Sequence, residues 1–116
     1  MKVMPDLFDV VELIVDISEH GLRAGMQGTI VDCHSEDAYE VEFTNEHGET
    51  VEFLALRTNQ FIIVWQAKTQ TWVSLTEQIV SLAANLSKEA KLEVLDFARF
   101  LNTRRQHKFV SQVNLK

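Results

Sequence analysis

Residues 38–44 alternate apolar and polar side chains without a break, and this period of two constrains the fold more than any other feature. Tyr39, Val41 and Phe43 fall on one side of the segment, and the intervening glutamates fall on the other. Such alternation is typical of a β-strand with one buried and one solvated face. The segment therefore predicts a half-buried strand.

The residues after this strand predict a β-hairpin. Gly48 supplies the backbone freedom that a hairpin connection needs. Residues 49–56 then return as the partner strand, in which we expect Val51 and Phe53 to face inward and Glu52 to face outward.

Further short strands follow one another closely through residues 6–66. The remaining β-rich segments are residues 9–17, 27–33 and 61–65. Five strands in so short a stretch bury little unless the sheet closes on itself, and closure also removes exposed edges. The sequence therefore predicts an α+β chain that begins with a small five-stranded SH3-like β-barrel, with Gly25 and Gly28 where the chain must bend.

The hydrophobic period changes from two to that of a helix after residue 73. Ser74 and Glu77 have the spacing of a capping box, and Ser87 is a second N-cap candidate. The short separation predicts a C-terminal helical hairpin. We therefore expect a barrel over residues 1–66, a linker over 67–73, the helical hairpin over 74–106 and a tail over 107–116.

Charge is distributed unevenly along the chain. Residues 1–66 contain 13 acidic and 3 basic side chains, a net charge of −10, whereas residues 67–116 contain 4 acidic and 8 basic ones, a net charge of +4. An acidic first half repels nucleic acid and attracts a basic surface. A surface that only aids solubility is the alternative.

Four glutamates cluster around the predicted hairpin and form the candidate acidic patch. On the solvated face of an alternating strand they lack the enclosed environment that general acid–base catalysis needs. A solvated face without function and a docking surface for a basic protein both remain open. The patch consists of Glu40, Glu42, Glu49 and Glu52.

The second predicted helix carries more apolar side chains than one face holds. Leu92, Leu95 and Phe100 lie outside its main stripe. Surplus apolar surface of this kind indicates an oligomer or a partner interface, so we expect a homodimer through the helices. Packing on the open side of the barrel is the alternative.

Basic side chains follow the predicted second helix. Arg104, Arg105 and Lys108 complement the negative end of the helix dipole. A contact with nucleic acid is the other interpretation, and it requires oligomerisation to multiply these positions.

The remaining residues predict no catalytic site, metal site or cofactor. Cys33 and His34 are adjacent on a predicted strand, so their side chains point apart, and no other histidine has ligand spacing. We expect Cys33 to be a buried or half-buried structural cysteine. A lone cysteine, no apparent signal peptide and no apolar run of membrane-spanning length predict a cytoplasmic protein without a membrane segment.

Two segments resemble bacterial families. Residues 7–65, with GLRAGMQGTIV at 21–31 and YEVEF at 39–43, resemble a family of small SH3-like domains of unknown function. Residues 75–101, with LSKEAKLEVLDFARFL at 86–101, resemble the helical segment of a family similar to antitoxins.

These resemblances and the charge pattern predict a protein-binding module without enzymatic activity. The antitoxin resemblance implies a neutralising protein that binds a basic partner, such as a nuclease toxin. The alternative is a docking or accessory subunit of a larger assembly, because similar small barrels serve in that role.

Overall fold

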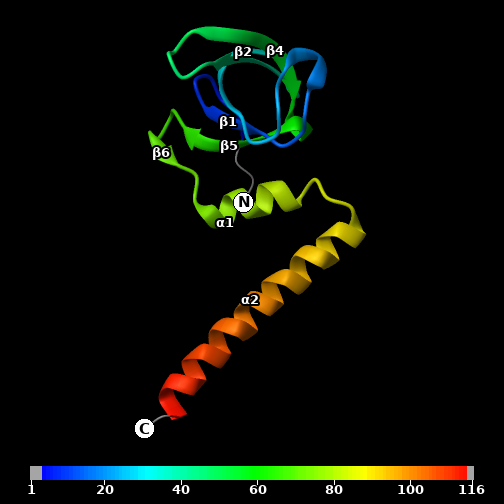
Figure 1. The fold of residues 1–116 in the computed structure, drawn as a ribbon. Helices are drawn as coiled ribbons and strands as arrows, with labels where there is room; N and C mark the ends of the chain where they lie inside the picture. Colours follow the sequence, from blue (N-terminus) through cyan, green and yellow to red (C-terminus); the bar gives the residue numbers. More distant parts are fainter. Residues whose placement is uncertain (1–3, 115–116) are drawn as a thin grey trace. The chain divides into compact units, whose positions relative to one another are not determined.

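The computed structural model describes residues 4–114, with side chains described as far as Arg104. An antiparallel sheet is followed by two helices, which confirms the predicted α+β class (Figure 1). The strands are β1 (Val10–Leu13), β2 (Gln27–Ser35), β3 (Ala38–Thr44), β4 (Thr50–Arg57), β5 (Phe61–Gln66) and β6 (Thr71–Trp72). The helices are the 3-10 turns η1 (Ser18–His20) and η2 (Thr58–Gln60), then α1 (Leu75–Ala83) and α2 (Lys88–Asn114).

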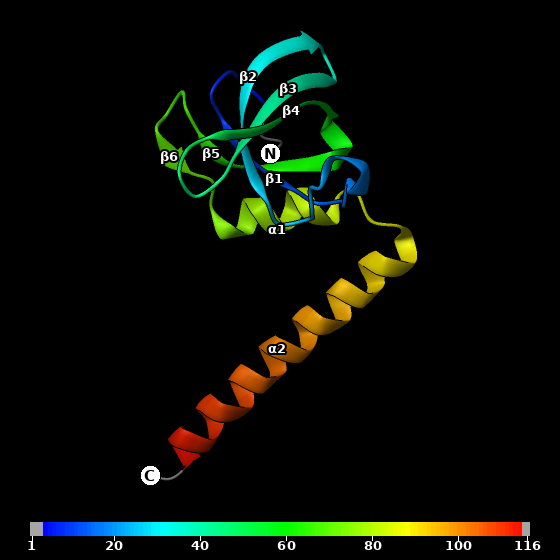
Figure 2. The ribbon, with the colours of Figure 1, turned by 45° about the horizontal axis from the view of Figure 1, so that its top comes forward.

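The sheet is strongly curved (Figure 2), and the side chains of the hydrophobic core lie on its inner face. As the alternation predicts, Tyr39, Val41 and Phe43 of β3 are buried. Their neighbours across the sheet include Ile30, opposite Val41, and Leu56, opposite Tyr39. Burial of these side chains from several strands is the main favourable contribution to folding of this part of the chain.

The sheet has six strands and is not closed, so the prediction of five strands is wrong. Its neighbour order is β4-β3-β2-β1-β5-β6. The extra strand, β6, falls inside the predicted linker and pairs Trp72 with Trp65. Gln70 makes this return possible, because it adopts a left-handed backbone conformation with φ of 55° between the two strands.

β4 faces the opposite way from the prediction. Glu52 lies opposite the buried Phe43, so it points to the inner side, and Val51 and Phe53 are 51% and 53% exposed. A β-bulge between Phe43 and Thr44 shifts the pairing by one residue. A shift of one residue moves every side chain of a strand to the other face.

Gly28 is required where β2 passes β3. A Cβ atom built on Gly28 would lie 2.6 Å from Cγ1 of Val41 and 2.9 Å from the carbonyl oxygen of Glu42. These distances are far below ordinary contact, and one of the two atoms belongs to the backbone. Gly28 is therefore needed for close packing of β2 against β3.

A buried carboxylate joins the start of the sheet to the end of β5. Asp9 is 1% exposed. Its Oδ2 accepts a hydrogen bond from the Asp6 amide at 2.9 Å, and its Oδ1 accepts one from the Ala67 amide at 2.9 Å. Burial raises the pKa of Asp9, and the two amides partly offset this effect.

Both predicted helix starts are confirmed. The Ser74 hydroxyl accepts a hydrogen bond from the Glu77 amide at 3.1 Å and donates one to the Glu77 carboxylate. Ser87 accepts one from the Ala90 amide at 3.1 Å. α2 continues to Asn114, past the residue at which the sequence places the start of the tail.

The chain divides into two compact units, Met1–Leu82 and Ala83–Lys116. The first contains the sheet and nearly all of α1, and the second contains α2. Among the described residues, no helix combines the length and the apolarity needed to cross a membrane.

We predict that Gly28→Ala lowers the free energy of unfolding by about 1–3 kcal/mol, the usual cost of overpacking a filled site. The added methyl group forces β3 to move, because its nearest neighbours are Val41 and the Glu42 backbone. Urea denaturation measures the change. Gly48→Ala is the control: its φ of 79° adds backbone strain, but nothing lies within 4 Å of the added Cβ. A Gly28 variant as stable as the natural protein contradicts the packing described here.

We predict that Asp9→Asn lowers the free energy of unfolding by about 1–3 kcal/mol, because one of two partly buried N–H donors then faces an amide nitrogen instead of an acceptor. Asp16→Asn is the matched control. Asp16 is exposed and accepts a hydrogen bond from the Ala24 amide, which an asparagine oxygen still accepts. Equal unfolding midpoints for the two variants would show that the two hydrogen bonds accepted by Asp9 do not stabilise the fold.

Candidate protein-binding surface

The structure divides the predicted acidic patch between two faces of the sheet. Glu40 and Glu42 alternate with the buried residues of β3 and therefore share its outer face. Glu49 is exposed in the hairpin connection, whereas Glu52 points to the inner side of β4. The prediction that Glu52 belongs to one outward patch is therefore wrong, and its cause is the bulge at Phe43 and Thr44.

Glu40 lies in an acidic environment that holds a histidine. It is opposite Asp32 on β2, and its carboxylate contacts Nε2 of His34 at 2.8 Å. The hydrogen bond to Glu40 raises the pKa of His34, and the charges of Glu40 and Asp32 add to the effect. This outer face of β2 and β3 therefore favours a positive charge.

The other glutamates also have neighbours within the chain. Glu42 accepts a hydrogen bond from the Thr50 hydroxyl, and Glu49 accepts one from the Asn45 side chain at 2.9 Å. These neutral donors leave the negative charge of both carboxylates in place. Glu52 instead pairs with Nδ1 of His20, a residue of η1, and so links the connection between β1 and β2 to β4.

Two apolar side chains share the outer face with Glu40 and Glu42. Phe53 lies directly opposite Glu42, and Val51 precedes it by two positions on the same strand. The prediction that both side chains face inward is wrong. The apolar run 53–56 leaves the face open, because an inward Phe53 and an inward pair of Leu54 and Leu56 both fit the alternation of a strand.

The predicted helix face is exposed in the structure. Leu92, Leu95 and Phe100 are all accessible, and so are Val94, Phe97 and Leu101 of the main stripe. The second unit contains one long helix, so it offers no second element against which to bury these side chains. The described part of this unit therefore leaves the apolar surface of α2 exposed.

The basic residues of α2 are only partly described. The guanidinium carbon of Arg104 lies 5.7 Å from the ring centre of Phe100, within the range of a cation–π contact. Arg99 pairs with Asp96 at 3.1 Å. Arg105 and Lys108 lie outside the residues whose side chains are described.

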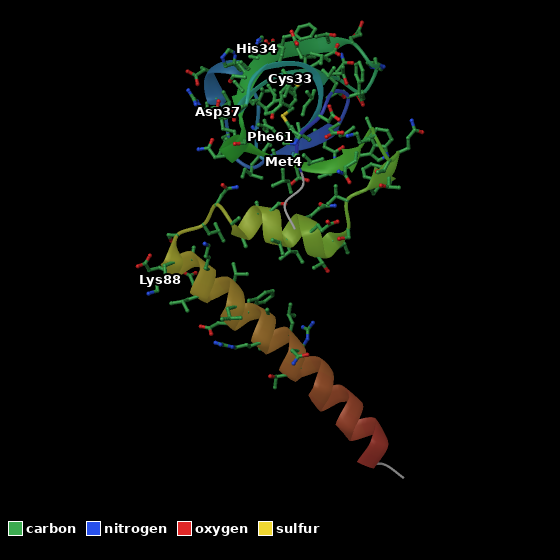
Figure 3. All side chains as sticks on the ribbon, turned by 180° about the vertical axis from the view of Figure 1, so that it is seen from behind. Met4, Cys33, His34, Asp37, Phe61 and Lys88 are labelled. Atoms are coloured by element: carbon green, nitrogen blue, oxygen red, sulfur yellow. The ribbon has the colours of Figure 1, made fainter. Side chains whose placement is uncertain are left out.

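Cys33 is exposed, so the prediction of a buried or half-buried cysteine is wrong. It lies near the end of β2, opposite Tyr39, where the curved sheet leaves it accessible, and His34 diverges from it (Figure 3). Partial desolvation and nearby carboxylates raise the pKa of its thiol, which disfavours the nucleophilic thiolate. Within the described part of the chain, no group of three or more His, Cys, Asp or Glu side chains is arranged to hold a metal ion.

We predict a pH-dependent contribution of His34 to stability. Its raised pKa means that the folded chain binds the proton more tightly than the unfolded chain does. The contribution is complete below the ordinary pKa of 6.5 and is lost as the pH rises through the folded value. His34→Gln should therefore lower the urea midpoint more at pH 5.5 than at pH 8.5. Equal losses at both pH values contradict the pairing with Glu40.

Comparisons with known proteins bear on the first unit only. No curated protein and no solved structure matches the chain. The resemblance of residues 75–101 to antitoxins gains no support and stays a prediction. Over residues 7–63, which contain the first four strands and the first half of the fifth, the chain is similar to the family described as a domain of unknown function (DUF4926).

Proposed function

We propose that this chain is a protein-binding module without enzymatic activity, whose acidic sheet unit binds a basic protein. The observation that carries the proposal is the outer face of β2 and β3, where Glu40 binds His34 at 2.8 Å and the charges of Glu40 and Asp32 favour its protonated form. A lysine or arginine of a partner would meet the same favourable potential. The net charge of −10 over residues 1–66 extends the attraction beyond this one site.

We also propose that the first unit, although its sheet is open, is a barrel of the SH3-like type. Three features support this interpretation: antiparallel pairing of consecutive strands from β1 to β4, a 3-10 turn between β4 and β5, and the return of β5 to β1. Such small barrels present loops and outer faces on a rigid frame, which suits a binding role.

Neutralisation of a basic protein is the form of binding that we favour. The resemblance of residues 75–101 to antitoxin-like proteins supports it, and a nuclease toxin would supply the basic surface. A docking or accessory subunit of a larger assembly is the second candidate, favoured by the two separate units of the chain. In that case the sheet unit recruits the partner and α2 anchors the module.

Binding is tested by capture from native lysate, with bound proteins identified by mass spectrometry. We expect the natural chain to retain a basic protein at low salt. The variant with Glu40→Lys and Glu42→Lys should retain at most a tenth of the amount that the control variant retains. The matched control is Glu89→Lys with Glu93→Lys, which makes the same charge change on α2. Growth arrest by the captured protein, relieved by this chain, indicates neutralisation, whereas recovery of a large assembly indicates docking.

Capture that is insensitive to the charge reversal at Glu40 and Glu42 contradicts the acidic-face proposal. Equal losses with the control pair would show that only the total charge of the chain matters. Either result removes the specific role of the outer face.

We further propose a homodimer formed through the helices. Light scattering should give about twice the chain mass of 13.3 kDa, and Leu92→Glu with Leu95→Glu should return the protein to the monomer. Both positions are exposed, so the charges should leave the helix itself intact. A monomer at high micromolar concentration rules out this interface.

A further inference from the structure

β4 forms one end of the sheet and carries a free edge. It spans Thr50–Arg57 and pairs on one side with β3. Among the described residues, no strand pairs with its other side. A free edge of this length presents unpaired backbone N–H and C=O groups, which form a template for a further strand.

The polar side chains of β4 are already engaged within the chain. Thr50 donates to Glu42, Glu52 pairs with His20, and the Arg57 guanidinium contacts Asp37 at 3.1 Å. Each contact fixes a residue near the edge, and none covers the outward apolar positions. The edge is therefore held in place while its outer row stays accessible.

That outer row is apolar. Val51 and Phe53 are each about half exposed, and Ala55 follows on the same face. Phe53 lies opposite Glu42, and Ala55 lies opposite Glu40. An added strand on the free edge would place its own outward side chains beside Val51 and Phe53, within reach of both glutamates.

The negative charge around the edge determines which kind of polypeptide segment can bind there. Residues 36–57 contain seven acidic side chains and one basic side chain, a net charge of −6. Glu36 and Asp37 lie before β3, and Glu46 and Glu49 lie in the connection to β4, so both ends of the hairpin are acidic. A second copy of this hairpin would be repelled, whereas a basic segment would be attracted.

We propose that the free edge of β4 binds an extended segment of a basic protein by strand addition. Backbone hydrogen bonds along the edge align the segment, and its outward basic side chains lay their apolar stems on Val51 and Phe53 and extend toward Glu40 and Glu42. The inference rests on the proposed function and deepens it, because it names the site and the conformation of the bound partner.

The binding probe is a ten-residue peptide of alternating lysine and valine with blocked termini, labelled for fluorescence anisotropy. We expect a dissociation constant in the micromolar range at low salt that weakens as salt rises. A glutamate–valine peptide of the same length should bind at least tenfold more weakly. No binding of the lysine–valine peptide, or equal binding of both peptides, overturns the proposal.

Amide hydrogen exchange locates the bound peptide. Saturating lysine–valine peptide should slow hydrogen exchange of those amides in residues 50–57 that point away from β3, since these amides gain hydrogen-bond partners. Protection confined to α2 or to the connection between β1 and β2 contradicts strand addition at this edge.

Phe53→Lys tests the apolar row and adds a charge that repels the peptide. Affinity should fall at least tenfold, whereas Leu75→Lys, the same kind of change at an exposed site on α1, should leave it unchanged. Val51→Lys gives a second test of the same row if the first variant folds poorly. Unchanged affinity in a folded variant of either residue overturns the proposal.

The two proposals can fail separately. If the native partner is lost on charge reversal at Glu40 and Glu42 but retained by Phe53→Lys, the acidic face binds a basic protein and strand addition at β4 is wrong. If the variant with charge reversal at Glu40 and Glu42 still binds the native partner, the proposed function itself fails.

Discussion

A one-residue shift in the pairing of β3 with β4 decides which side chains the sheet unit presents to solvent. The bulge between Phe43 and Thr44 turns Glu52 inward and Phe53 outward. Glu52 then meets His20, and the outer face gains an apolar row beside Glu42. The candidate binding surface thus depends on a local irregularity in strand pairing that also positions the edge of the sheet.

Much of the fold was predictable because its signals are local. Strict alternation in residues 38–44 located β3 and its buried face, and the hydroxyls of Ser74 and Ser87 located two helix starts. The face of β4 that is buried was not predictable from its sequence, because apolar side chains occupy both odd-numbered and even-numbered positions from Phe53 onward. Only pairing with β3, which no local pattern encodes, resolves the ambiguity.

Of the candidate site, Glu40 and Glu42 were assigned to the correct face, whereas Glu52 was not. The role of Asp9 was also beyond local reasoning, because its partner amide at Ala67 is distant in sequence.

The two units have complementary character. The sheet unit buries an apolar core and exposes acids together with a few apolar side chains such as Phe53, whereas α2 exposes apolar side chains such as Phe97 and Phe100. Burying that helix requires an association that the second unit alone does not supply.

The most direct test of the central claim is a hydrogen-exchange footprint of the native partner on the intact chain. Binding through the acidic sheet unit predicts slower exchange in residues 36–57, where the outer glutamates and the β4 edge lie. Protection confined to α2, with the β3–β4 hairpin unchanged, would contradict the account and assign recognition to the helix.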